Sequence, residues 1–372
     1  MKKLLTLSLV LLSIVSCVSK SEKEDGVANK MDDSFLPQAT GQAGELVIVM
    51  NKEKWSAELG DALKEVFHAT VPGLTRNEPA FTTRVIEPFQ FNRIFQLARN
   101  IVYVTTLDGK TPADKWLQNT LTESSKERIK NEPELFMFNS DNQYAQRQKV
   151  MHLFGNNDAE LIKHIRENEE ILINYFNKAE RQRLATDIRA SVDSKAISSR
   201  YQKEHGYYIK VPVGFEVAMD ENNFTWSRYL PSVGPSKNIF VYYKDYESQD
   251  EFKHENIVKL RNEIAKKYIY GDPENPESYV ITETEFMQPI FREINFDGKF
   301  TVETRGAWKT NNFSVGGPFI SYTFVEESTN RLYYVEGFII HPNEQHRELI
   351  RQMESIISTF RSTAKKSQAS LY

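Results

Sequence analysis

The side chains best suited to hold a ligand lie near the end of the chain, around one tryptophan and three glycines. Arg305, Gly306 and Trp308 fall in an expected strand, and Gly316 and Gly317 fall in the loop that we expect to follow it. A glycine inside a strand often marks a bulge or a place where another group approaches the backbone closely. A cation and an indole beside such a gap suit an anionic or sugar ligand. We therefore nominate these five residues as candidate ligand-binding residues.

The same stretch also has a purely structural explanation, in which Trp308 fills the core and Gly306 relieves crowding. Neighbouring strand residues point to opposite faces, so Arg305 and Trp308 share a pocket only if a bulge brings them together. A site therefore predicts irregular pairing at Gly306 and a partly exposed Trp308 ring. A regular strand with a buried Trp308 predicts core.

The rest of the sequence has no recognisable catalytic or metal-binding motif. It contains neither a glycine-rich phosphate loop nor a Gly-x-Ser-x-Gly nucleophile elbow. His341 and His346 are five residues apart, whereas zincins place two histidines four apart on one helix face. We therefore expect no metal and no cofactor, and we nominate no catalytic residue.

Two patterns leave the function class open. Carboxylate pairs such as Glu283 and Glu285 serve a hydrolase only when they face each other across a cleft. Tyrosine pairs at 207–208, 242–243 and 333–334 direct one ring of each pair to either face of a sheet. If one face is uncovered, sugars or peptides can stack there; otherwise the rings pack beneath loops or against the other domain.

The first seventeen residues form the pattern of a secretory signal, with two lysines, an apolar run over 4–15, then Ser16 and Cys17. The run is too short for a membrane-spanning helix, which needs about 20 residues. Residues 14–17 resemble a bacterial lipobox, in which the cysteine becomes the first mature residue and carries lipid. An ordinary signal with an incidental cysteine is the alternative. We predict a lipoprotein signal over 1–17 and lipidation of Cys17, the only cysteine, which anchors the chain to a membrane.

Composition limits the partners and the location of the mature chain. The formal net charge is −4, and −6 without the two lysines of the signal, which argues against nucleic acid as a partner. Residues 18–43 are polar and small, so we predict a flexible tether. We expect a lipid-anchored protein of the cell envelope, at the outer membrane on its periplasmic side or at the cell surface.

The chain after the tether divides into two α+β domains and a polar tail, at 44–192, 193–361 and 362–372. The first domain begins with a buried strand over 46–50 and then alternates strands with helices, which predicts an open sheet with helices on one face. The second domain is richer in strands. We expect a long, mostly exposed helix over 178–204 to join the two.

Several stretches carry a family resemblance: 44–50 with Trp55, 60–63, 99–101, 305–308 with 316–319, and 337–338. They resemble an uncharacterised lipoprotein family of the Bacteroidota, domain of unknown function 4837, over nearly the whole mature chain. The resemblance implies a cell-envelope lipoprotein without assigned activity, so it transfers no functional residues. The second half also resembles the Mog1/PsbP-like group, whose members are mostly binding and assembly modules.

These observations favour a membrane-anchored envelope lipoprotein that acts as a binding or scaffolding module. Its expected partners are the membrane, through the lipid anchor, and an unknown envelope protein, peptide or glycan. The alternative is an envelope hydrolase whose site lies between the two domains. An exposed aromatic platform would favour the binding module, and a cleft with paired carboxylates would favour the enzyme.

Overall fold

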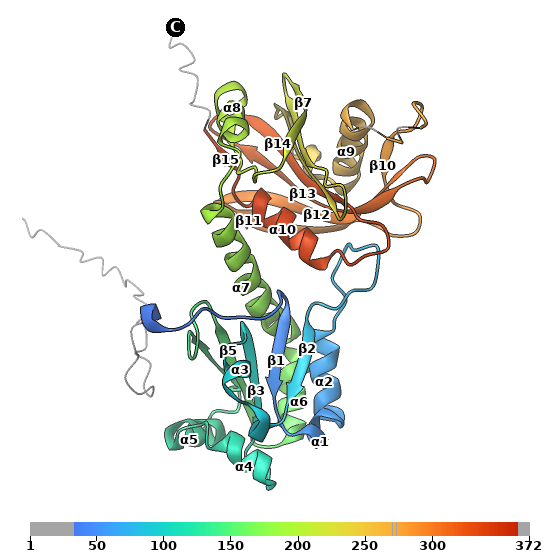
Figure 1. The fold of residues 1–372 in the computed structure, drawn as a ribbon. Coiled ribbons are helices and arrows are strands. Elements are labelled where there is room, and N and C mark those ends of the chain that lie inside the picture. Colours follow the sequence, from blue (N-terminus) through green and yellow to red (C-terminus); the bar gives the residue numbers. More distant parts are fainter. Residues whose placement is uncertain (1–32, 270, 273, 364–372) are drawn as a thin grey trace, which may run out of the picture.

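The computed structural model describes residues 33–269, 271–272 and 274–363. The predicted signal, Cys17, the first part of the predicted tether and most of the tail lie outside these residues. The described chain forms one main sheet in each half, with helix α7 (Glu169–Ala190) reaching from the first to the second (Figure 1). The predicted α+β fold class is confirmed. Among the described helices, none combines the length and the apolar character needed to cross a membrane.

The sheet of the first half is parallel except at one edge. Its strand order is β2-β1-β3-β5-β4, and β4 runs antiparallel to β5. β1 and β3 are almost continuous runs of buried residues, as expected for parallel strands covered on both faces. The strands are β1 (Glu45–Val49), β2 (Thr82–Ile86), β3 (Asn100–Thr106), β4 (Met137–Asp141) and β5 (Lys149–Gly155).

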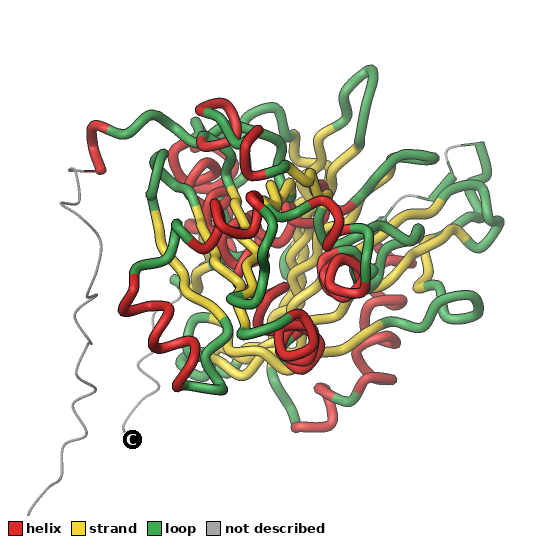
Figure 2. Tube along the Cα trace, turned by 90° about the horizontal axis from the view of Figure 1, so that it is seen from below, coloured by secondary structure: helices red, strands yellow, loops and turns green. Residues whose placement is uncertain are grey.

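Helices cover both faces of this sheet, so the prediction of helices on one face is wrong. One face packs against α2 (Glu58–Phe67), α6 (Asp158–Glu167) and α7, and the other against α4 (Pro112–Gln118). The continuous apolar run of β1 supplies both faces, because alternate strand residues point to opposite sides. Figure 2 shows helices on more than one side of the strands. The other helices of this half are α1 (Lys52–Trp55), η2 (Pro88–Gln90), α3 (Arg93–Gln96) and α5 (Glu123–Asn131).

The described end of the predicted tether lies against the first domain. After the short helix η1 (Asp33–Phe35), Gln38 forms a bridge with Gln146, and Thr40 forms one with Ala98. The main-chain N–H of Thr40 also donates to the Leu97 carbonyl at 2.7 Å. The prediction of a free tether is therefore corrected for this segment. Main-chain hydrogen bonds order it, and they require no apolar pattern in the sequence.

The second half is built on an antiparallel sheet of eight strands. Seven follow the order β10-β12-β13-β14-β9-β8-β7, and β11 pairs with β12 on the same side as β10. No pattern in the sequence predicts β7, because three of its six residues are charged and none is fully buried. The strands are β7 (Glu216–Glu221), β8 (Phe224–Tyr229), β9 (Ser236–Asp245), β10 (Val280–Thr282), β11 (Ile290–Phe296), β12 (Lys299–Thr310), β13 (Gly316–Glu326) and β14 (Arg331–Ile340).

This second sheet is also covered on both faces. Helix α10 (Arg347–Ile357) packs on one face and α9 (His254–Tyr268) on the other. Tyr333 belongs to the first of these cores and Tyr334 to the second, and both rings are fully buried. The tyrosine pairs are therefore not an open aromatic face. The remaining elements are β6 (Tyr207–Tyr208), η3 (Gln249–Phe252) and β15 (Arg361–Ser362), of which β15 pairs with β6.

The predicted connecting helix is two helices. α7 ends at Ala190, and α8 (Lys195–His205) begins after a short break. α7 is not mostly exposed, since it buries one side against the first sheet and meets α10 of the second half. Glu180 and Arg183 on this side are 0% and 5% exposed. Because both residues are charged, the sequence pattern suggested a solvated face.

A loop from the first half penetrates the second, and we call residues 69–80 the finger. Its Leu74 is buried in the apolar core beneath α10. Its Glu78 caps α10, because the main-chain N–H groups of His346 and Arg347 donate to the two carboxylate oxygens at 2.7 and 2.9 Å. Gly73, with φ +76°, lets the finger lie against β12, since a Cβ there would approach Arg305 within 2.6 Å. The two halves are thus interlocked, not merely joined.

Candidate functional site: an arginine-lined cleft between the domains

A cleft of about 270 Å³ lies where the two halves meet. The finger and α7 form its walls on one side, and β11, β12 and α10 form them on the other. Five arginines from four different elements line the cleft: Arg181, Arg292, Arg305, Arg347 and Arg351.

Glu354 on α10 holds two of these arginines. Its two carboxylate oxygens lie 2.9 Å from a nitrogen of Arg181 and 3.0 Å from a nitrogen of Arg305. Burial alone would raise the pKa of Glu354, but the charges of Arg305 and Arg181 outweigh it and hold that pKa below its ordinary value. For Arg305, burial lowers the pKa, and the charges of Glu354 and Glu303 more than compensate, so its pKa is raised. The carboxylate therefore stays ionised at neutral pH.

Arg347 and Arg351 are fully engaged by the protein. Arg347 donates to Glu348, to the Pro79 carbonyl and to Thr82. Arg351 likewise donates to Glu348, to the Ala80 carbonyl and to Asn177. These bonds tie α10 to the finger and to α7. The two side chains shape the cleft and have little capacity left for a ligand.

Arg292 and Arg181 keep donors free. Arg292 is exposed on the edge strand β11, and it makes no hydrogen bond or ion pair with any residue that the structure describes. Arg181 is 41% exposed, and its bond to Glu354 uses Nη1 alone. A guanidinium carries five N–H donors in a planar fork that matches carboxylate and phosphate groups. This end of the cleft can therefore accept an acidic group.

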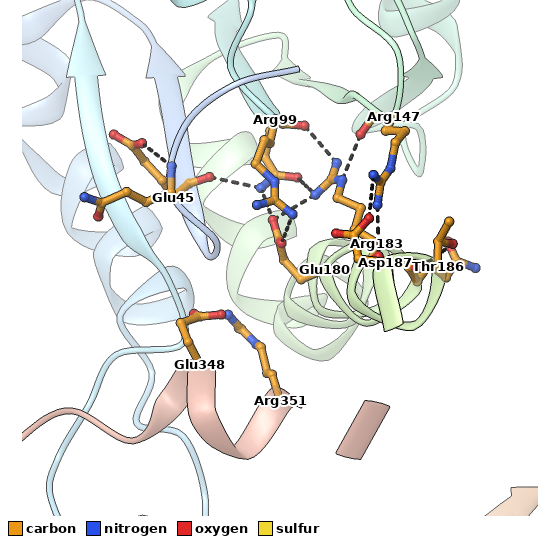
Figure 3. A network of polar contacts seen from close by, with 12 residues as sticks. Glu45, Arg99, Arg147, Glu180, Arg183, Thr186, Asp187, Glu348 and Arg351 are labelled. Carbon is orange, nitrogen blue, oxygen red and sulfur yellow. Dashed lines mark hydrogen bonds and ion pairs between the residues drawn. The ribbon is translucent and has the colours of Figure 1, made fainter. Parts of the chain in front are cut away.

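A second arginine network lies at the other face of α7, and we call it the closed network (Figure 3). Glu180 accepts from Asn100 and from Arg183, each at 2.8 Å, and lies 3.0 Å from Arg99. Arg183 also donates hydrogen bonds to Asn100 and to the carbonyls of Arg99 and Arg147. These bonds fasten α7 to the starts of β3 and β5. The closed network has no room for a ligand because its central groups are buried.

Of the five nominated residues, Arg305 alone lines the cleft. Gly306 pairs with Phe319 in an uninterrupted antiparallel register, and Trp308 is 2% exposed on the opposite face from Arg305. The predicted pocket shared by arginine and indole is therefore wrong, and this stretch is core. Gly316 and Gly317 lie in β13 and not in a loop, because they pair with Lys309 and Trp308.

Two other polar clusters contact neighbouring groups of the protein. His346 lies against the His341 carbonyl at 3.0 Å and near Glu78, so the two histidines do not converge on a common point. Glu204, His205 and Asp220 place their ligand atoms within 4.8 Å of one another. However, Arg200 lies 3.0 Å from Glu204 and 2.7 Å from Asp220, so a cation of the protein already occupies this arrangement.

Most residues of the cleft carry no signal in the sequence. Its arginines are separated by up to 170 positions, and none belongs to a local motif. Two glycines, Gly73 and Gly306, mark where the finger meets β12, since a Cβ on Gly73 would lie within 3.1 Å of both Arg305 and Gly306. Glycines that permit close backbone approach can thus point to an interface as readily as to a ligand.

The fold and the cleft define a two-domain α+β protein whose halves meet at a charged interface. Comparisons with known families divide it in the same place. Residues 194–359 match the family described as Domain of unknown function (DUF4837), as the sequence resemblance predicted. Residues 39–189 match a different one, Domain of unknown function (DUF8532). The expectation that the first family would extend over nearly the whole mature chain is therefore corrected.

Solved structures show partial similarity only. A protein from Bacteroides thetaiotaomicron is 10% identical with a TM-score of 0.23; the match covers 45% of this chain and 47% of that one, about half its length. The Ran-binding protein Mog1p of Saccharomyces cerevisiae is 9% identical with a TM-score of 0.26, over 42% of this chain and 90% of that one. The human StarD13 lipid transfer and protein localization domain is 8% identical with a TM-score of 0.20, and the match covers 45% of this chain and 98% of that one. No curated protein matches the sequence.

Proposed function

We propose that this chain is a membrane-anchored cell-envelope lipoprotein, lipidated at Cys17, and that it acts as a binding module for an acidic ligand. The observation that carries the ligand class is the free Arg292 guanidinium beside the half-used Arg181 at the cleft. The lipid anchor rests on the signal pattern that ends at Cys17.

The size of the cleft narrows the ligand. Pockets for drug-sized molecules usually measure about 300 to 1,000 Å³, and this cleft of about 270 Å³ lies below that range. It suits one acidic group, such as the carboxylate end of a peptide or a phosphate-bearing head, with the remainder of the ligand outside. Such a group would contact β11 of one domain and α7 of the other.

The hydrolase alternative receives less support from the same residues. A pair of catalytic carboxyls requires groups free to exchange protons or to attack a substrate. Glu354 is the buried carboxylate among the described residues that line the cleft, and both its oxygens are bound to arginines. The other two lining carboxylates, Glu169 and Glu170, are neighbours on the exposed first turn of α7. Binding is therefore the function that this geometry favours.

Titration calorimetry at low salt with citrate and with inorganic phosphate tests the ligand class. We expect citrate to bind the unchanged protein and the Arg292→Ala variant to bind it at least tenfold more weakly, because a charge-assisted contact is lost. Arg128→Ala serves as a matched control, since Arg128 is exposed on α5 and pairs with Glu132, and neither residue lines the cleft. The acidic ligand would be rejected if neither citrate nor phosphate binds the unchanged protein. It would also be rejected if Arg292→Ala binds citrate as tightly as the unchanged protein does.

The anchor has a separate test. Cys17→Ala removes the only thiol, so we expect an unlipidated protein that moves from the detergent phase to the aqueous phase in phase partition. A variant that still partitions wholly with membranes would show that something other than Cys17 holds the protein there. Cysteine replacement leaves the cleft intact, and the calorimetric result should be the same.

A further inference from the structure

Two exposed phenyl rings flank one lysine at the edge of the second sheet. Phe286 is 84% exposed and Phe313 is 65% exposed. Lys309 Nζ lies 5.7 Å from the first ring centre and 4.4 Å from the second, so the two rings are at most about 10 Å apart. Single exposed apolar residues are common, but two aromatic rings set on the same lysine form a defined surface.

The loop that carries Phe286 is held from behind. The buried Glu283 carboxylate accepts from the main-chain N–H groups of Glu285 and Phe286, at 2.6 and 3.0 Å. The same carboxylate lies 3.0 Å from Lys309 Nζ, and Glu285 lies 3.2 Å from it on the exposed side. The position of the Phe286 ring is thus set by a fixed main chain and a fixed cation.

The turn that carries Phe313 is also held, in an unfavourable conformation. Phe313 has φ +57°, a left-handed backbone that large side chains rarely adopt. The buried Thr310 hydroxyl accepts from the main-chain N–H groups of Ser314 and Val315, at 3.0 and 3.3 Å, and the Thr310 carbonyl accepts from Phe313 at 2.9 Å. The turn therefore presents the Phe313 ring toward solvent.

The size of this surface indicates the kind of ligand. A buried phenylalanine side chain covers at least 150 Å², so two rings that are 84% and 65% exposed offer roughly 220 Å² or somewhat more. A stable protein partner needs about 800 Å² on each side. The surface is therefore too small for a protein interface by itself and matches a ligand of one or two rings. Around the aromatic rings lie charged groups, Glu285 and Lys309, that can donate and accept hydrogen bonds.

We propose that Phe286 and Phe313 form a carbohydrate-binding platform, distinct from the interdomain cleft. The apolar C–H face of a sugar stacks on the phenyl rings, and its hydroxyl groups bond to Glu285 and Lys309. Lys309 follows Arg305 by four residues on β12, so the platform lies roughly 13 Å along the strand from the cleft. A glycan at the platform and an acidic group in the cleft can therefore be bound independently.

Co-sedimentation with insoluble cellulose, chitin and purified peptidoglycan sacculi tests the platform. We expect the unchanged protein to co-sediment with at least one of these polymers, and a Phe286→Ala/Phe313→Ala variant to lose at least tenfold in bound fraction. Phe89→Ala is the matched control, since Phe89 is 66% exposed in the first half and far from the platform in the sequence. A Phe313→Trp variant should retain binding, because a larger ring still stacks.

Three results would overturn the platform. One is failure of the unchanged protein to sediment with any of the three polymers. Another is equal sedimentation by the double alanine variant with unchanged circular dichroism. The third is loss of self-association in light scattering by the double variant while polymer binding persists, which would assign the rings to contact between protein chains.

Discussion

The two arginine networks on either side of α7 use the same residue types for different purposes. In the closed network, Glu180 and Arg183 are buried and bonded to one another, to Asn100 and to main-chain carbonyls. In the cleft, Arg181 lies two residues before Arg183 and shares Glu354 with Arg305, and Arg292 has no partner among the described residues. One helix therefore carries a structural clamp on one side and available donors on the other.

The two networks differ in how many guanidinium N–H donors are already bonded to the protein, and not in the charges that they contain. Ion pairs alone would place both networks in the same class, since each combines several arginines with buried glutamates. In the closed network every nitrogen of the buried Arg183 guanidinium donates to a protein group, so removal of Glu180 leaves the charge of Arg183 uncompensated. The cleft network leaves donors toward solvent, so removal of its outermost member should affect binding and not folding. Substitutions at the two networks can separate these roles.

The largest effect is expected for Glu180→Gln. The change leaves the side chain of Arg183, which is 6% exposed, without its carboxylate, and breaking a buried pair in this way costs about 3 to 5 kcal/mol. The free energy of unfolding, measured with urea, should fall by that amount. Glu132→Gln provides the control, because Glu132 pairs with Arg128 on the exposed surface of the first half. Equal stability of the two variants would contradict the clamp.

An intermediate and pH-dependent effect is expected for Glu354→Gln. Arg305 keeps Glu303 as a partner at 2.7 Å, so the loss should be about 1 to 3 kcal/mol at neutral pH. Because the pKa of Glu354 is lowered in the folded protein, its contribution is complete above the ordinary glutamate pKa of about 4.3 and is lost as pH falls through the lowered value. The stability difference between protein and variant should therefore shrink in acid. A difference that grows below pH 4 would contradict this assignment.

The smallest effect on folding is expected for Arg292→Ala. An exposed side chain without partners should change the free energy of unfolding by no more than about 0.5 kcal/mol. Thermal unfolding without citrate should therefore coincide with that of the unchanged protein, whereas the rise in Tm caused by citrate should be lost. A variant destabilised as strongly as Glu180→Gln would show that Arg292 is structural and that the two networks do not differ as argued.

Sequence patterns predict where the buried strands lie better than they predict which faces of the sheets and helices are buried. The buried strand that the sequence predicts over 46–50 is found as β1 (Glu45–Val49), because its apolar and β-branched residues form a continuous run. No pattern predicts β7, half of whose residues are charged, and the segment of α7 is expected to be a mostly exposed helix because its buried side includes Glu180 and Arg183. Burial of charge depends on partners that are distant in sequence, so no local pattern reveals it.

The candidate sites show the same limitation more sharply. Arg305 is nominated because of its neighbours Gly306 and Trp308. In the structure it lines the cleft, where it pairs with Glu354, which is 49 positions away in the sequence. Arg292 is an ordinary arginine of an edge strand, and only the approach of the finger and α7 gives it a role. Nothing in the sequence relates Phe313 to Phe286, because the positive φ of Phe313 and the approach of both rings to Lys309 are properties of the folded chain.

The finger has a consequence for the order in which the protein is made. The groups that Glu78 caps lie 268 and 269 positions later in the chain, and Leu74 enters a core completed by α10. At a synthesis rate of about 5 to 20 residues per second, these partners emerge roughly 13 to 54 seconds after the finger itself. During that interval the first domain can assemble its own sheet, while an apolar side chain and a carboxylate wait without partners. The finger therefore has its binding partner on the last helix that the structure describes, α10. A chain truncated before α10 should leave the finger exposed to chaperones and proteases.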